Sequence, residues 1–249
     1  MAQKSRRWLK RMGIALLVLL AVVAGAFAWY VSDYSHADDT ARAALSQSVQ
    51  GDISLVELED GSLAFVPSSP TIGMVFYPGA KVEAEAYAPL LHTCAEQGIL
   101  CVLVHPPFNF ALLNVGAAQQ PMAAFPEVER WIMCGHSLGG VAASSFTNEH
   151  AGEVDALVLL ASYPACDLSN YQGDVLTIVG ENDQVVNHDK LEAARNDLPP
   201  GARTLIIKGG NHAYFGNYGE QTGDGTATIS HEAQQEQTAK AISELLGNK

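Results

Sequence analysis

The chain has 249 residues, of which 48% are hydrophobic and 16% are charged, so it can bury a large core and is not a disordered protein. Its formal net charge of −13 excludes a general nucleic-acid-binding protein, which needs cations facing phosphates. Four cysteines are too few for a disulfide-built scaffold, and none of them forms a CxxC pair. We assign no disulfide bridge to Cys94, Cys101, Cys134 or Cys166.

The N-terminal segment combines a cluster of basic residues with an uncharged apolar span, Met12 to Val31. Twenty residues in a helix rise about 30 Å, the thickness of the hydrocarbon core of a membrane. The positive-inside rule keeps the basic end in the cytoplasm and the rest of the chain outside it. We therefore expect residues 1–31 to be a signal anchor in the cell membrane. The alternative is a cleaved signal peptide and a secreted protein, because Ala24-Gly25-Ala26 and Ala26-Phe27-Ala28 have the small-x-small form. The basic residues are Lys4, Arg6, Arg7, Lys10 and Arg11.

The next stretch, residues 32–51, is polar and rich in alanine, which indicates a juxtamembrane spacer with partial helical character. Residues 52–249 have the size of one catalytic domain. At its start, Ile53–Glu59 and Ser62–Val66 flank the turn pair Asp60-Gly61, which predicts two strands joined by a type I′ hairpin turn.

From there, apolar runs alternate with amphipathic stretches, a pattern typical of an α/β fold with a mostly parallel sheet flanked by helices. The predicted strands are Ile72–Tyr77, Ile99–Val104, Trp131–Cys134, Ala156–Ala161, Val175–Val179 and Thr204–Ile207. The predicted helices are Glu83–Gln97, Phe110–Ala124, Leu138–His150, His188–Asp197 and a last helix from Ser230 to Leu246. Gly98 ends the first of these helices, and Pro121 breaks the second. Ser230 caps the start of the last helix, and Gly247 stops it.

The run Gly135-His136-Ser137-Leu138-Gly139 matches the pattern G-x-S-x-G. It follows the predicted strand Trp131–Cys134 and opens a predicted helix, which is the strand–turn–helix setting of a nucleophile elbow. Ser137 would then stand at a helix N-terminus, where the helix dipole favours a developing oxyanion. The alternative is a glycine-rich turn whose serine has no chemical role.

A serine hydroxyl needs a base to accept its proton, and in this setting the partners follow in the order Ser, Asp or Glu, His. The strand Val175–Val179 is followed by a polar turn that contains Asp183, our candidate acid, and Glu181, the reserve candidate. The last predicted strand is followed by Gly209-Gly210-Asn211-His212, so His212 is the candidate general base. The other histidines fail in chain order or in placement, and they are His36, His92, His105, His136, His150, His188 and His231.

An oxyanion hole needs two backbone N–H groups. One would come from Leu138, directly after the nucleophile. The second would come from Ala80 in the loop Tyr77–Lys81, where Gly79 lets the backbone approach the substrate. An ordinary Pro-Gly turn is the alternative for this loop.

These residues resemble the α/β-hydrolase superfamily, and in particular its compact branch of dienelactone-hydrolase-like proteins, "alpha/beta hydrolase family 5". The resemblance covers about residues 52 to 247. It implies the α/β-hydrolase fold with a sheet similar to the eight-stranded sheet of that family. It also implies serine-hydrolase activity, most often assayed with ester substrates, and a triad of Ser137, Asp183 and His212. The segments that carry it are Gly135–Gly140, Tyr77–Lys81, Pro106–Asn109 and Gly209–Gly219.

Two departures from the wider superfamily matter. Only Tyr163–Asp174 stands where larger members insert a cap domain, so no large cap and an open site are expected. The nucleophile is a serine, so the cysteine-based chemistry of dienelactone hydrolases does not carry over.

Further residues of the resembling segments are candidates for contact with the substrate. Pro106–Asn109 would either line the acyl site or only end a strand, and Phe215–Thr228 would either cover the site or be a packed connector. If the second segment covers the site, Tyr214, Phe215, Asn217 and Tyr218 would lie near the substrate. The candidate substrate-binding residues are Gly79, His136, Phe108, Asn109 and Phe215.

The sequence thus predicts a serine hydrolase outside the cytoplasm that cleaves a small-molecule carboxylic ester through an acyl-enzyme (carboxylesterase-like, EC 3.1.1.-), without a metal or other cofactor. Alternatives are an acyltransferase, a thioesterase or an amidase with the same triad, or a catalytically idle surface binding module. The chain after residue 31 contains nine basic residues and all 27 acidic ones, so its net charge is −18. This charge favours neutral or cationic substrates over phospholipid surfaces. The sequence indicates no particular oligomeric state.

Overall fold

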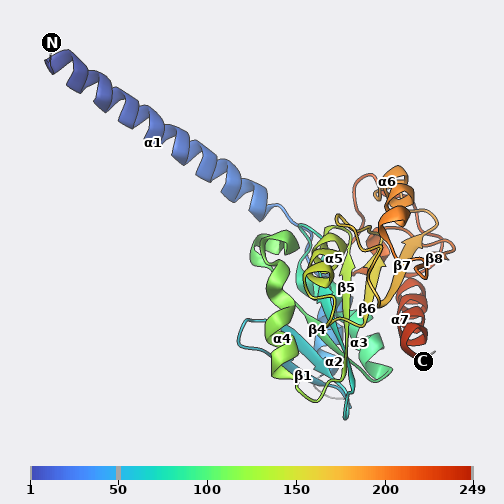
Figure 1. The fold of residues 1–249 in the computed structure, drawn as a ribbon. Helices are drawn as coiled ribbons and strands as arrows, with labels where there is room; N and C mark the ends of the chain where they lie inside the picture. Colours follow the sequence, from blue (N-terminus) through green and yellow to red (C-terminus); the bar gives the residue numbers. More distant parts are fainter. Residues whose placement is uncertain (1, 49–51, 248–249) are drawn as a thin grey trace. The chain divides into compact units, whose positions relative to one another are not determined.

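The computed structural model describes residues 2–48 and 52–247, and the chain divides into two compact units, Met1–Tyr34 and Ser35–Lys249. The first unit contains a single long helix, α1 (Ala2–Ser32), drawn in blue in Figure 1. Within it, the 23 residues Lys10–Ser32 are long and apolar enough to cross a membrane or to serve as a signal sequence. The predicted N-terminal apolar helix is therefore present.

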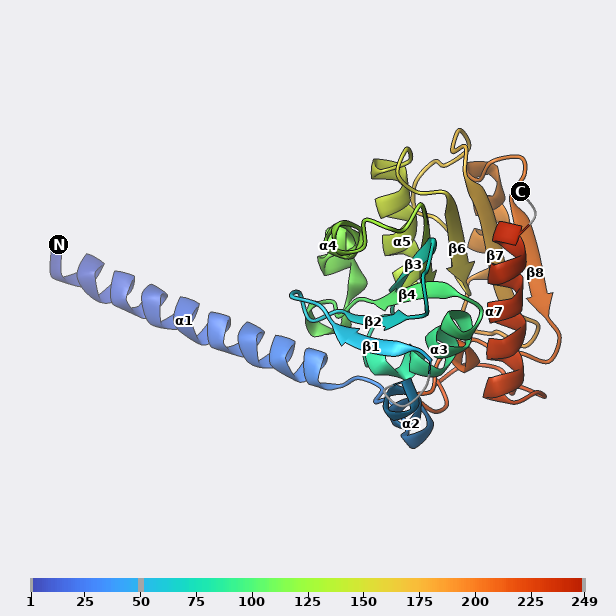
Figure 2. The same ribbon diagram turned by 90° about the horizontal axis from the view of Figure 1, so that it is seen from below.

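The second unit is built on an eight-stranded sheet (Figures 1 and 2). Strands β3 to β8 run parallel, while β1 and β2 add an antiparallel edge. The carboxyl ends of parallel strands meet at one edge of a sheet, so the loops that follow β3, β5, β6, β7 and β8 gather there. In spatial order the strands are β1 (Ser54–Glu57), β2 (Leu63–Val66), β4 (Ile99–Leu103), β3 (Ile72–Tyr77), β5 (Arg130–His136), β6 (Ala156–Leu160), β7 (Asp174–Gly180) and β8 (Arg203–Ile207).

Helices cover both faces of the sheet. On one face α3 (Ala88–Glu96) and α7 (His231–Gly247) bury the strand residues Met74 and Phe76. On the other face α5 (Leu138–Glu149) packs over their neighbours in β3, Val75 and Tyr77. This alternation along one strand is the period of two expected for a β-strand buried on both faces. The α/β fold class that the sequence predicts is confirmed, and no large cap interrupts the short connection between β6 and β7.

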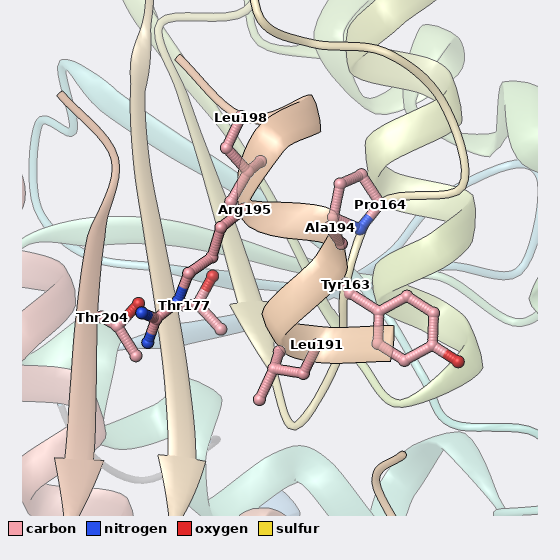
Figure 3. Close-up of a pocket in the computed structure, with 8 residues that line it drawn as sticks. All are labelled: Tyr163, Pro164, Thr177, Leu191, Ala194, Arg195, Leu198 and Thr204. Carbon is pink, nitrogen blue, oxygen red and sulfur yellow. The ribbon is translucent and has the colours of Figure 1, made fainter. Parts of the chain in front are cut away.

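The segment after α6 (His188–Ala193) continues as a 3₁₀-helix, Ala194–Asp197, beside β7 and β8. Figure 3 shows a small cavity there, of about 20 Å³, with Arg195 pointing toward Thr204. That volume holds one water molecule at most. We therefore regard this cavity as a packing gap and not as a ligand site.

The predicted spacer of residues 32–51 is wrong for residues 35–48, which belong to the folded domain, although the expected partial helical character is confirmed by a helix. Ser35 pairs with Val82, and Ala37 is buried just before α2 (Asp39–Ser48). Ala41 and Ala44 of α2 pack against the same face of the sheet as α3. The alanines are small, so their buried stripe has little hydropathy signal, and the segment resembles a polar linker. The folded domain therefore begins at Ser35 and not at residue 52, and residues 49–51 lie outside the described residues.

The hairpin between β1 and β2 also differs from the prediction. A type I′ turn needs positive φ at both central residues, but only Gly61 has one, with φ +81°. The amide of Gly61 donates to the carbonyl oxygen of Leu58, and that of Leu58 donates to the carbonyl oxygen of Ser62. Leu58 and Ser62 thus close the hairpin with three residues between them, in the pattern of a type I turn followed by a left-handed glycine.

Helix boundaries follow local signals with one exception. Gly98 has φ +86° after α3, and the hydroxyl of Ser230 accepts the amide of Ala233 at the start of α7, as predicted. The exception is the predicted helix Phe110–Ala124, which is two 3₁₀-turns followed by α4 (Gln119–Ala124). Pro121 does not break α4, because a proline in the first turn removes no helical hydrogen bond.

The four cysteines have free thiols: Cys94, Cys101 and Cys134 are buried and Cys166 is half-buried.

The burial of α2 predicts that a charge at Ala41 destabilises the domain. Replacing Ala41 with Asp places an unpaired carboxylate in the core, so we expect the free energy of unfolding to fall by about 2–4 kcal/mol. For a domain of this size the melting temperature would fall by roughly 5–15 °C. The matched control is Ala43→Asp, at an exposed position of the same helix. Equal melting temperatures for the two variants would contradict the burial of α2.

Candidate active site

Ser137 stands at the sharp turn between β5 and α5. Its backbone has φ 51° and ψ −122°, a region that residues with a side chain rarely adopt and that is found at functional sites. The flanking glycines make this turn possible. A Cβ on Gly135 would overlap the backbone of Gly139, and a Cβ on Gly139 would overlap the carbonyl oxygens of Tyr77 and Pro78. The local geometry is that of a nucleophile elbow.

His212, after β8, is paired with Asp183, after β7. Nδ1 of His212 lies 2.9 Å from Oδ2 of Asp183, and both side chains are fully buried. A carboxylate only accepts hydrogen bonds, so Nδ1 carries the proton and Nε2 is left as an acceptor. The second carboxylate oxygen, Oδ1, accepts the backbone amides of Val185 and Val186, each at 2.9 Å. Both oxygens are therefore held, and the carboxylate is directed at the imidazole.

Ser137 and His212 line one cavity of about 160 Å³. Nε2 of His212 is buried and has no hydrogen-bond partner among the residues that the structure describes. A hydroxyl and an unused acceptor therefore share a cavity. No Asp, Glu, Lys or Arg side chain lines it, and His212 is its one lining histidine; the other lining residues are Leu138, Val141, Ala161, Ser162, Tyr163, Val185, Val186 and Asn187.

The reserve acid, Glu181, has a different place. It is exposed, and its Oε2 accepts the backbone amide of Gly209 at 2.9 Å. It makes no hydrogen bond to His212 in the described part of the chain. Of the two candidate acids, the structure brings only Asp183 to the histidine.

Two residues that hold the loops of the site, Asp224 and Gln234, are not among the candidates that the sequence indicates. Asp224 accepts the amides of Gln184 and Ala213, and so ties the loop after β7 to the loop after β8. Gln234 in α7 both accepts from the amide of Asn211 and donates to its carbonyl oxygen, at 3.0 and 2.8 Å. Neither residue has a sequence signal, because each acts on backbone that is close only in the folded chain.

The two candidate oxyanion donors lie on neighbouring elements. Leu138 is the first residue of α5, and the loop with Ala80 abuts the first turn of that helix, as the contacts of Gly139 show. The amides on either side of Ala80 are engaged: Gly79 donates to the hydroxyl of Tyr87, and Lys81 donates to the carbonyl oxygen of Asn109. Those of Ala80 and Leu138 themselves have no acceptor within residues 2–48 and 52–247.

None of the five candidate substrate-binding residues lines the cavity of Ser137. His136 and Phe215 are fully buried, and Phe108 is exposed but outside the cavity. The backbone amide of Gly79 and the carbonyl oxygen of Asn109 are used by hydrogen bonds within the protein. Burial argues against direct substrate contact for His136 and Phe215, whereas contact through the exposed Phe108 and the half-buried Asn109 stays a prediction.

The connector after His212 is packed. Asn217 and Tyr218 are buried, and Tyr214 stacks on His231 with ring centroids 3.5 Å apart. Of the two expectations for the start of Phe215–Thr228, the structure therefore shows the packed connector. No group of three potential metal ligands occurs among the described residues.

Comparisons with known proteins agree with this architecture. Residues 73–236 match the model of the alpha/beta hydrolase family, whereas no curated protein matches the sequence. Among solved structures, the chain is similar to a dienelactone hydrolase from Anabaena variabilis, with 18% identity, a TM-score of 0.59 and coverage of 79% of this chain and 98% of that chain.

Two further structures have the same fold. An esterase domain from a Rhodothermus marinus protein is 13% identical, with a TM-score of 0.57 and coverage of 77% of this chain and 95% of the other. A bacterial membrane phospholipase A is also 13% identical, with a TM-score of 0.59 and coverage of 96% and 98%. At such identities the likeness concerns the fold, while the family match spans well over half of the sequence. The chain therefore belongs to the alpha/beta hydrolase family.

Proposed function

We propose that this α/β hydrolase is a serine esterase that cleaves a small, uncharged carboxylic ester through an acyl-enzyme. The observation that carries the proposal is the buried pair of Asp183 and His212, whose free Nε2 shares a cavity with the hydroxyl of Ser137. This arrangement supplies the base that a serine hydroxyl needs in order to attack a carbonyl carbon.

In the first half of the reaction, Oγ of Ser137 bonds to the carbonyl carbon and its proton passes to Nε2 of His212. Asp183 holds the ring and stabilises the imidazolium that forms. The carbonyl oxygen becomes an oxyanion, for which the amides of Ala80 and Leu138 are the proposed donors. The carbon–oxygen bond to the leaving group then breaks, and the alcohol departs with the proton from Nε2.

In the second half, a water molecule gives a proton to Nε2 and attacks the acyl carbon. The resulting tetrahedral species collapses, the proton returns to Oγ of Ser137, and the carboxylic acid leaves. Ser137, Leu138 and His212 line the cavity, Asp183 is bonded to His212, and no step of the proposed reaction needs a metal or cofactor.

The cavity also supports a class of substrate. A volume of about 160 Å³ is close to that of a cavity that holds one benzene ring, roughly six heavy atoms. Val141, Ala161, Val185 and Val186 give the lining an apolar part, and no Lys, Arg, Asp or Glu side chain belongs to it. This favours a short acyl or aryl group and disfavours a charged one. Esters are also the substrates that the name of the Rhodothermus marinus esterase domain implies for that protein.

For location, we propose that α1 anchors the enzyme in the cell membrane with the catalytic domain outside the cytoplasm. The apolar stretch Lys10–Ser32 is long enough to span the bilayer, and the basic residues precede it. Cleavage after this segment, with secretion of the domain, is the alternative.

Replacing Ser137 with Ala removes the proposed nucleophile. We expect the full-length variant to lose labelling by a fluorophosphonate probe and to lose at least about 10⁴-fold in kcat on a soluble ester. Ser145→Ala is the matched control, because Ser145 lies in α5, the helix that directly follows Ser137, and its hydroxyl donates to the carbonyl oxygen of Val141. Labelling that persists in Ser137→Ala, or that disappears equally in Ser145→Ala, would refute the proposal.

Replacing Asp183 with Asn keeps the shape of the acid but presents an amide to Nδ1. The ring then favours the wrong tautomer, and we expect kcat to fall by roughly 10⁴-fold with a folded protein. Glu181→Gln should change kcat by less than about twofold, since the amide oxygen can still accept from Gly209. Similar losses in both variants would show that Asp183 is not the acid of the triad.

Enlarging the cavity should change the preference for the acyl chain. In Val186→Ala, the ratio of kcat/KM for a hexanoyl ester to kcat/KM for an acetyl ester should rise by roughly tenfold. The variant opens space for one or two methylene groups of the longer acyl chain, and burying that many in an apolar pocket changes kcat/KM by about this factor. The control is Val154→Ala, a buried valine that does not line this cavity. The cavity is not the acyl site if both variants keep the wild-type ratio.

A further inference from the structure

A buried chain of hydrogen bonds runs through His136, the residue before the nucleophile. The amide of Gly79 donates to the hydroxyl of Tyr87 at 3.1 Å, and that hydroxyl lies 2.8 Å from Nδ1 of His136. Nε2 of His136 lies 3.1 Å from the carbonyl oxygen of His212. The chain thus joins the loop after β3 to the loop after β8 across the back of the elbow.

The direction of every bond in this chain follows from its ends. The carbonyl oxygen of His212 can only accept, so Nε2 of His136 carries the proton and Nδ1 is an acceptor. The hydroxyl of Tyr87 therefore donates to Nδ1, and its oxygen accepts from the amide of Gly79. Each donor has one acceptor. In a neutral ring, reversing the bond between Tyr87 and His136 would move the proton to Nδ1 and leave Nε2 and the carbonyl oxygen of His212 as two acceptors facing each other.

The same groups are tightly packed. Tyr87, His136 and His212 are all fully buried, and the rings of His136 and His212 have centroids 4.6 Å apart. A Cβ on Gly79 would lie 2.8 Å from the hydroxyl of Tyr87 and 3.0 Å from Nδ1 of His136. The loop backbone therefore rests directly on the Tyr87–His136 hydrogen bond, which explains why a glycine stands there.

From this arrangement we infer that His136 and Tyr87 are positioning residues that hold the oxyanion loop and the loop of His212 in one fixed relation. The inference rests on the proposed function. Gly79 directly precedes Ala80, so the bond to Tyr87 fixes the direction in which the amide of Ala80 points. The bond from His136 fixes the backbone of the residue that moves the proton.

Chemistry also favours a neutral ring at this place. Burial lowers the pKa of His136 well below its usual range, and the neighbouring His212 adds to the effect. A neutral His136 does not repel the imidazolium that forms on His212 during catalysis. Burial likewise raises the pKa of Tyr87, so its hydroxyl keeps the proton that it donates.

The test removes one hydroxyl in the full-length protein. Tyr87→Phe breaks the chain and keeps the ring, whereas Tyr171→Phe removes another buried hydroxyl, which donates to the carbonyl oxygen of Val154. We expect Tyr87→Phe to lower kcat on a soluble ester roughly 10- to 100-fold with KM within about twofold, because oxyanion donors act in the transition state. Tyr171→Phe should keep kcat. Equal kcat values in both variants overturn the inference.

A second pair of variants separates hydrogen bonding from ring packing. His136→Phe keeps an aromatic ring and loses both bonds, while His136→Gln keeps one donor and one acceptor. Higher kcat in His136→Gln than in His136→Phe, at equal melting temperatures, is expected. The reverse order would show that only packing matters at this position.

A readout independent of esterase activity distinguishes this inference from the proposed function. In detergent micelles, the low-field proton resonance of Nδ1–H of His212 should shift in Tyr87→Phe and stay in place in Tyr171→Phe. An unchanged resonance in Tyr87→Phe overturns the coupling. If the resonance shifts while wild-type Ser137 fails to react with a fluorophosphonate, the coupling stands and the proposed function fails.

Discussion

The site depends on one buried hydrogen bond, between Nδ1 of His212 and Oδ2 of Asp183. A carboxylate without water around it is costly unless both oxygens are bonded, and here the amides of Val185 and Val186 bond the other oxygen. The loop after β7 therefore has to close around the carboxylate, and the loop after β8 has to reach it. Asp224 joins the two loops from outside, and the free side of the imidazole is left toward the cavity of Ser137.

Two groups of residues surround this hydrogen bond: those that line the cavity and those that are buried behind it. The cavity surface has no Lys, Arg, Asp or Glu side chain and contains Ser137, the nucleophile of the proposed reaction. Behind it lies a buried layer in which Tyr87 and His136 connect backbone groups by hydrogen bonds. A catalytic group on a loop is placed as precisely as the elements that hold the loop. The buried hydrogen bonds of Tyr87 and His136 therefore help to fix the positions of the catalytic loops at the edge of the parallel sheet.

Local patterns in the sequence were reliable where one segment carries the whole signal. The elbow around Ser137 and the cap at Ser230 depend on neighbours within a few residues, and the strand Ile72–Tyr77 was predicted with its observed bounds. The failures have a different cause. The buried alanines of α2 carry little hydropathy signal, and the Asp60-Gly61 pair is compatible with both a two-residue and a three-residue hairpin loop.

The amino-acid sequence predicts the α/β class, the apolar N-terminal helix, and a serine, an acid and a histidine in the chain order of a hydrolase triad, because hydrophobic periodicity and order along the chain do not depend on which loops meet. The folded structure was needed to show that Asp183 and not Glu181 meets His212, and that His136 is buried in the protein interior. Those outcomes depend on which loops meet at the carboxyl edge of the sheet and on how burial forces each polar atom to find a partner.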